Sequence, residues 1–143
     1  MTKMLEETLQ TQAVLKKQWL DNSSLRIEIA SEINKMNPYC FATIARGSSD
    51  HAAAYLNYLI SLELEKLSMS LSPSLVSIHE KNLDFSNTVG VAIAHSGKGP
   101  DILSLVKHIN CQNSLSLALV NDASSPVAKE ASFFYPLLAG KEM

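Results

Sequence analysis

The feature that most constrains the fold of this chain is a repeated alternation between short apolar runs and longer amphipathic segments. Three of the runs are almost continuously apolar and lie at residues 40–45, 88–94 and 115–120. Such runs are typical of strands covered on both faces, as in parallel sheets. Residues 67–72 instead alternate strictly between apolar residues and serine, which predicts an edge strand. A fifth run, at 133–138, contains Pro136 and is also expected at an edge.

Segments with helical periodicity separate these runs. Residues 52–64 form one of them. Another carries an apolar stripe at spacings i, i+3, i+4 and i+7, made of Ile102, Leu105, Val106 and Ile109. Two shorter helices are expected after Pro73 and Pro126. Strands that alternate with helices predict an α/β domain with a parallel sheet that is covered on both faces.

The residues before the first apolar run predict two helices. Apolar side chains recur at helical spacing as far as Trp19, and the polar residues 21–23 predict a break that caps a second helix. Pro38 ends that second helix. The sequence therefore predicts one domain over residues 1–143, with N-terminal helices at 1–37 and an α/β core at 38–143.

Charge balance and cysteine content exclude several functions. The 143 residues include 12 Lys and Arg against 14 Asp and Glu, so no basic surface for nucleic acid is expected. Cys40 and Cys111 provide no disulfide framework, and no His/Cys/Asp cluster has the spacing of metal ligands. The sequence has neither a run of ~20 apolar residues for a membrane span nor the apolar core of a signal peptide. We expect a cytoplasmic domain without a cofactor, a metal or a membrane partner.

The turns that follow the predicted strands are the places to look for a ligand site, because open α/β sheets bind ligands outside the carboxyl ends of their strands. After 40–45, Gly47 permits a tight turn, and Ser48 or Ser49 stands where the next helix begins. A helix N-terminus with two hydroxyls can receive an anion. The alternative is that the serines only cap the helix.

The turn after 88–94 contains a hydroxyl, a cation and two glycines, in the order His95, Ser96, Gly97, Lys98 and Gly99. Pro100 and Asp101 then mark the start of a helix. This composition suits phosphate, although the spacings of nucleotide-binding motifs are absent. The alternative is a flexible glycine loop with a solvated lysine. Two such turns after adjacent strands favour an anion site more than either does alone. The third turn, 121–126, is explained by Ser125 as an N-cap.

The residues around the first two turns resemble the two signatures of sugar isomerase (SIS) domains. Residues 44–54 read IARGSSDHAAA, which is similar to the first signature. Residues 91–101 read VAIAHSGKGPD, which is similar to the second, usually a strand followed by Ser-Gln-Ser-Gly and often by Pro-Asp. Further elements follow in the order of the family, at residues 72–74, 120–121, 125–128 and 139–142. This ordered succession covers essentially the whole chain.

The resemblance implies a three-layer αβα sandwich of flavodoxin-like topology, with a parallel sheet of about five strands. The most similar group comprises the isomerase half of glucosamine-6-phosphate synthase (glutamine–fructose-6-phosphate aminotransferase) and related aminosugar-phosphate deaminase/isomerases. There the two turns hold the sugar's phosphate with hydroxyls and backbone N–H groups. The carry-over implicates seven residues in phosphosugar binding, namely Gly47, Ser48, Ser49, His95, Ser96, Gly97 and Lys98.

Two positions depart from the family pattern. Ala94 stands where the family has a serine, and Gly99 replaces a Ser or Thr that often contacts phosphate. Each loses a charge-assisted hydrogen bond of about 1.5–3 kcal/mol. Lys98 can compensate electrostatically, and His95 can add a hydrogen-bond donor. Otherwise the site is weakened or retuned.

Members of this group usually carry two SIS halves, and most catalytic groups lie in the second half and the tail. We therefore expect this chain to be a first half, and we assign no catalytic residue. It is either part of an isomerase or aminotransferase acting on a hexose 6-phosphate or aminosugar phosphate, or a non-catalytic phosphosugar-binding or regulatory module. A remnant that folds but binds nothing is the third possibility. The missing next helix leaves an apolar patch, which predicts a homodimer or higher oligomer.

Overall fold

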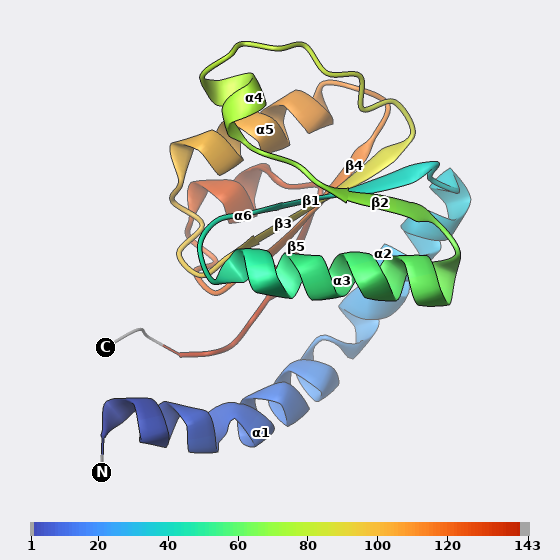
Figure 1. The fold of residues 1–143 in the computed structure, drawn as a ribbon. Helices are drawn as coiled ribbons and strands as arrows, with labels where there is room; N and C mark the ends of the chain where they lie inside the picture. The colour runs from blue at the N-terminus through green and yellow to red at the C-terminus, as the bar shows by residue number, and fades with distance from the viewer. Residues whose placement is uncertain (1, 141–143) are drawn as a thin grey trace.

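The computed structural model describes residues 2–140, so Lys141 and Glu142 of the last family motif lie outside the described residues. Five parallel strands form one sheet in the order β2-β1-β3-β4-β5, with helices on both faces (Figure 1). The strands are β1 (Cys40–Ala45), β2 (Leu67–Ser70), β3 (Thr88–Ala94), β4 (Leu115–Val120) and β5 (Phe133–Pro136). The predicted flavodoxin-like α/β sandwich is confirmed, with β2 and β5 at its two edges.

The helices of the core follow the strands as the sequence predicts. They are α3 (Ser49–Leu64), α4 (Ser74–Ser77), α5 (Pro100–Asn110) and α6 (Pro126–Glu130). The boundaries differ in three places, because α3 begins at Ser49 rather than residue 52, and β2 and β5 end at Ser70 and Pro136 rather than 72 and 138. The last residues of both predicted edge strands therefore belong to turns at the carboxyl edge of the sheet.

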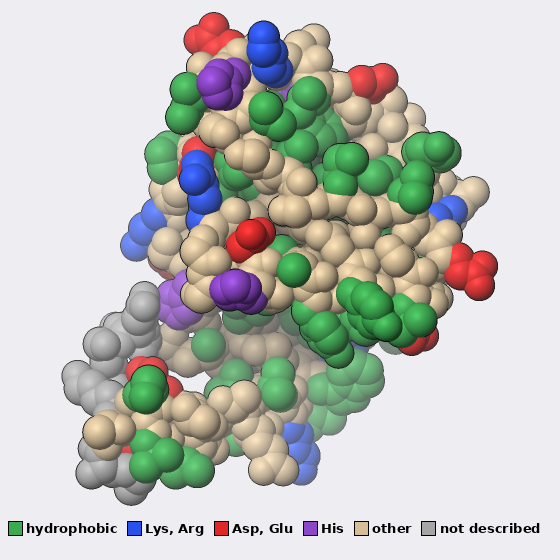
Figure 2. Space-filling view, viewed as in Figure 1, with side chains coloured by type: hydrophobic (Ala, Val, Ile, Leu, Met, Phe, Trp, Pro, Cys, Tyr) green, Lys and Arg blue, Asp and Glu red, His purple; other side chains and the backbone are tan. Residues whose placement is uncertain are grey.

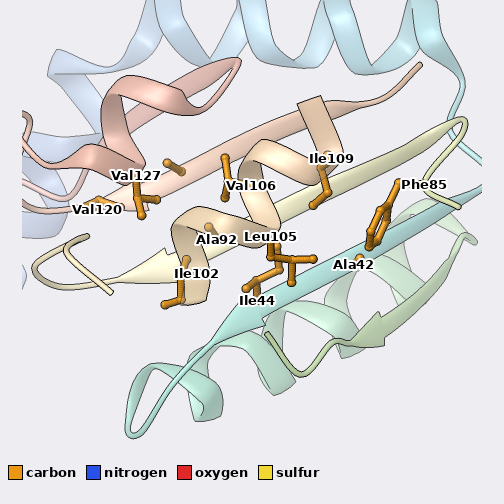
Figure 3. Packing of buried hydrophobic residues seen from close by; sticks show 11 residues of the cluster. Ala42, Ile44, Phe85, Ala92, Ile102, Leu105, Val106, Ile109, Val120 and Val127 are labelled. Carbon is orange, nitrogen blue, oxygen red and sulfur yellow. The ribbon is translucent and has the colours of Figure 1, made fainter. Parts of the chain in front are cut away.

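The main core lies between the sheet and α5. The predicted apolar stripe of α5 points at the strands (Figure 3), and its four side chains, Ile102, Leu105, Val106 and Ile109, are each at most 4% exposed. Burying side chains of this size contributes about 1.5–3 kcal/mol each. On the opposite face α3 packs against β1, β2 and β3, with Ala53 and Ile60 buried. The helices that follow β1 and β3 therefore cover opposite faces.

The two predicted N-terminal helices are present as α1 (Lys3–Asp21) and α2 (Ser23–Met36). The predicted break lies at Asn22, but its side chain does not cap α2. Instead the Asn22 amide is 5% exposed and donates a hydrogen bond to the Pro136 carbonyl oxygen at 3.1 Å. The Gln18 amide donates to the carbonyl oxygen of Leu137. The junction of the two helices is thus tied to the end of β5, a partner too distant in sequence for a capping pattern to reveal.

Apolar side chains stay partly accessible at two corners of the sheet. On the α5 face Leu67 of β2 is 62% exposed, and on the α3 face Leu117 and Leu119 of β4 are half-buried. Helix α1 extends away from the sheet and keeps Leu9 and Trp19 exposed, and hydrophobic side chains gather along α1 and over α3 (Figures 1 and 2). Within residues 2–140, no helix combines the length and the hydropathy needed to cross a membrane.

The Asn22 hydrogen bond gives the first testable prediction. Asn22→Ala leaves the Pro136 carbonyl oxygen without its donor and should lower the free energy of unfolding by about 1–3 kcal/mol in urea titrations. Asn34→Ala is the matched control, because Asn34 is exposed on α2 and has no side-chain hydrogen bond among the described residues. Equal effects of the two substitutions would contradict a tethering role for Asn22.

Candidate functional site

The candidate site lies where β1 and β3 end side by side at the carboxyl edge of the sheet. The two strands pair in parallel up to Ala45 and Ile93. The chain then continues into α3 on one face after β1, and into α5 on the other face after β3. Divergence of this kind leaves a crevice between the two turns, which is where doubly wound sheets bind ligands.

The turn after β1 presents its two serines without using them as caps. Gly47 has a φ of +60°, and the α3 N-cap residue, Ser48, makes no side-chain capping bond. Within residues 2–140 neither Ser48 nor Ser49 has a hydrogen-bonded side-chain partner, and Ser48 is exposed while Ser49 is half-buried. The capping alternative is therefore not what the structure shows, and both hydroxyls can serve a ligand.

The turn after β3 is held rigidly by Gly97. This glycine is buried with a φ of +62°, and a Cβ there would lie 2.4 Å from Ser125 Oγ and 2.7 Å from Val120 Cγ1. Its carbonyl oxygen accepts a hydrogen bond from the Val127 amide at 3.2 Å. The turn is packed against the start of α6 and is no flexible loop. Ser125 caps α6 as predicted, since Ser125 Oγ accepts from the Ala128 amide.

Lys98 extends from this turn to an acidic partner. Its ammonium lies 3.6 Å from Asp122 Oδ2, so this exposed lysine has an acidic neighbour in addition to solvent. Hydrogen bonds from Ser124 hold the pKa of Asp122 below its usual value, and the charge of Lys98 lowers it further. Lys98 therefore lines the hollow with an acidic neighbour that offsets part of its charge.

A second ion pair joins the first turn to the second. Arg46 Nε and Nη2 both contact Asp101 Oδ2, at 2.7 Å and 2.5 Å. Burial acts to raise the pKa of Asp101, but the hydrogen bond and charge of Arg46, together with the Ile102 amide, leave that pKa below its usual value. Asp101 is thus ionised and fixed at the start of α5.

A hollow of about 670 Å³ opens beside the second turn. The lining residues come from α1, the second and third turns and the C-terminal tail, and are Lys17, His95, Ser96, Lys98, Asn121, Asp122, Ala123, Leu138 and Gly140. Asn121 fixes the tail there, since its Oδ1 accepts from the Ala139 amide at 2.8 Å and its Nδ2 donates to the Gly140 carbonyl oxygen. A hollow of this size with a few convergent polar groups is suited to a small polar ligand.

The structure brings together only part of the predicted set. His95, Ser96 and Lys98 line the larger hollow, while Ser48 and Ser49 do not, and Gly47 lines a separate hollow of about 350 Å³ beside the end of β2. Sequence reasoning missed Lys17 and Asn121. Of these two, only Asn121 could have been found from the sequence, because it belongs to the family element at residues 120–121. It was missed because the third turn was explained by Ser125 as an N-cap.

The other histidine and cysteine side chains that could serve a site either contact structural partners or form no cluster. His108 Nε2 lies 3.0 Å from the Leu83 carbonyl oxygen, and its ring meets Phe85 edge-on. Burial raises the pKa of the Cys40 thiol. Across the part of the chain that the structure describes, no three His, Cys, Asp or Glu residues are grouped to hold a metal ion.

Comparison with known proteins finds similar structures only, because no family model and no curated protein matches the sequence. A candidate phosphosugar isomerase from Silicibacter pomeroyi is 32% identical over 99% of this chain, with a TM-score of 0.92. The C-terminal domain of glucosamine-fructose-6-phosphate aminotransferase from Francisella tularensis is 20% identical over 98% of this chain, with a TM-score of 0.83. The NanR protein of Vibrio vulnificus, complexed with ManNAc-6P, is 15% identical over 93% of this chain, with a TM-score of 0.69. This chain spans 43%, 40% and 53% of those three chains.

The packing around Gly97 gives the second prediction. Gly97→Ala should lower the free energy of unfolding by at least about 2 kcal/mol more than Gly47→Ala. Both glycines have positive φ, but a Cβ at Gly47 meets nothing within 4 Å, so that substitution carries only the backbone strain of about 1–2 kcal/mol. Thermal or urea unfolding of the two variants measures the difference, and similar losses would show that Gly97 is not held by packing.

Proposed function

Because this chain has the fold of a sugar isomerase (SIS) domain, we propose that it binds a phosphosugar at the carboxyl edge of its sheet. The observation that carries this proposal is the pair of Gly-Ser turns after β1 and β3, with hydroxyls that the described residues leave available at Ser48 and Ser49. Among the described residues, the Ser96 hydroxyl has only a long contact, in which Ser96 Oγ accepts from the Lys98 amide at 3.4 Å, so its proton is available to a ligand. Hydroxyl donors at helix N-termini are a common way to hold phosphate.

The larger hollow is the place we propose for the sugar ring. We place the phosphate beside Ser96 and His95 and the ring beside Asn121 and Lys17, all of which line the hollow. The ligand class is a hexose 6-phosphate or an aminosugar phosphate. Two structural neighbours support this class, one by its name and the other by its bound ManNAc-6P. A cytoplasmic setting is part of the proposal, since Cys40 and Cys111 are free thiols.

We further propose that the chain works as the amino-terminal half of an aminosugar-phosphate isomerase or aminotransferase. Aldose–ketose isomerisation needs a base beside the reacting carbons. The titratable groups around the hollow are Lys17, His95, Lys98 and Asp122, and the last two are paired with each other. Among these described groups the one carboxylate, Asp122, is already paired with Lys98. We therefore propose that a second SIS half or another protein supplies the catalytic base.

A non-catalytic phosphosugar-binding module is the second candidate. Ala94 and Gly99 favour it, because neither has the hydroxyl that the family uses against phosphate. Interconversion of fructose and glucose 6-phosphates by the purified chain would exclude this alternative, while binding without turnover would favour it.

The third prediction tests the phosphate-binding role of Ser96. Ser96→Ala should weaken binding of glucosamine 6-phosphate by about 1–3 kcal/mol, because it removes a charge-assisted donor. Isothermal titration calorimetry measures the affinity. Ser31→Ala, at an exposed position on α2, is the control and should leave affinity unchanged. An unchanged affinity in Ser96→Ala would remove Ser96 from the site.

The fourth prediction concerns self-association, which we propose through the exposed apolar residues of α1. Leu9 is 67% exposed, so Leu9→Glu should preserve folding but shift a homodimer to monomers in sedimentation velocity at micromolar concentration. Gln10→Glu adds the same charge at a neighbouring exposed position and should leave the dimer intact. A monomeric unsubstituted chain would overturn the proposal.

A further inference from the structure

The first turn has few contacts that hold it in place. A Cβ on Gly47 would meet nothing within 4 Å, and the side chains of Ser48 and Ser49 have no hydrogen-bonded partner among the described residues. Its backbone bonds are local, from the Asp50 amide to Gly47 and from the His51 amide to Ser48. Ser70 Oγ donates a long hydrogen bond of 3.5 Å to Asp50 Oδ1, which ties the start of α3 to the end of β2. None of these contacts fixes the first turn relative to the second turn.

The Arg46–Asp101 ion pair is what connects this turn to its neighbour. Within residues 2–140 it is the one hydrogen-bonded or ionic link between the turn after β1 and the segment from Ser96 to Asp101. Two donors of one guanidinium meet a single carboxylate oxygen, which fixes direction as well as distance. Asp101 is itself anchored in the first turn of α5 and is only 22% exposed at its side chain.

Arg46 also cancels a charge that would oppose an anionic ligand. The Asp101 carboxylate accepts the Ile102 amide and so occupies part of the α5 N-terminus, where a phosphate would otherwise be attracted. Without a cation beside it, that carboxylate would repel phosphate at the second turn.

From these contacts we infer that Arg46 and Asp101 are positioning residues, which hold the first turn against the second so that Ser48 and Ser49 stay within reach of the phosphate of a sugar bound in the hollow that Ser96 lines. This inference rests on the proposed function. It assigns the pair no direct contact with the ligand. The effect of Asp101→Asn on ligand affinity distinguishes a positioning role from other roles of Arg46. If Arg46 instead bound phosphate or only balanced charge, Asp101→Asn would tighten binding, whereas loss of a positioning contact weakens it.

The experiment is a double-mutant cycle on the affinity for glucosamine 6-phosphate, measured by calorimetry. Arg46→Gln, Asp101→Asn and the double variant should each bind about tenfold more weakly, with the double variant no weaker than either single one. Arg46→Lys keeps the charge but not the two-donor contact, and should also lose affinity. Tighter or unchanged binding by Asp101→Asn, or full affinity in Arg46→Lys, overturns the inference.

Two controls separate this inference from general effects. Lys35→Gln breaks the exposed Glu32–Lys35 pair on α2 and should leave affinity unchanged. Amide hydrogen exchange needs no ligand, and exchange at Asp50 should speed up severalfold in Asp101→Asn if the first turn is released. Unchanged exchange at Asp50 also overturns the inference. Failure of the unsubstituted chain to bind would overturn the proposed function, and with it the role of the pair in binding.

Discussion

The need to cover both faces of a parallel sheet determines where this molecule can bind anything. Backbone groups pair within the sheet, and its apolar faces must be buried by the helices that connect the strands. Here α3 leaves β1 toward one face and α5 leaves β3 toward the other, although the two strands are neighbours. The two turns therefore diverge at the carboxyl edge of the sheet. Divergence at this point creates the crevice in which doubly wound sheets bind ligands. In this chain glycines permit the two turns, and hydroxyls line them.

Apolar surface remains accessible elsewhere on the molecule. Leu67 of β2 is exposed, Leu117 and Leu119 of β4 stay half-buried on the face where α2 packs, and α1 leaves most of its apolar residues exposed. Exposed apolar surface of this extent usually marks an association surface. The chain spans 43% and 40% of the matched chains from Silicibacter pomeroyi and Francisella tularensis, which agrees with our proposal that a second half or a second copy completes the site.

Polar side chains at the carboxyl edge are organised by partners distant in sequence. Asn121 holds the tail at Ala139 and Gly140, Lys98 faces Asp122, and Arg46 reaches Asp101 in another crossover unit. The described lining of the hollow holds two lysines, Lys17 and Lys98, against the one carboxylate of Asp122, beside hydroxyl and amide groups. The phosphosugar that we propose suits this lining, because its hydroxyls need hydrogen bonds as much as its phosphate needs donors.

The sequence by itself determined the number and type of the strands, the edge positions of β2 and β5, the stripe of α5 and the two Gly-Ser turns. These are local properties, since periodicity, Pro and Gly act within a few residues. Tertiary structure alone decided that Asn22 anchors β5 instead of capping α2, that Lys98 is paired, and that Lys17 and Asn121 join the hollow. It also left Ser48 and Ser49 outside the hollow that Ser96 lines. The reason is physical: a side chain's partner depends on which strands the crossovers make adjacent, and no local pattern encodes that adjacency.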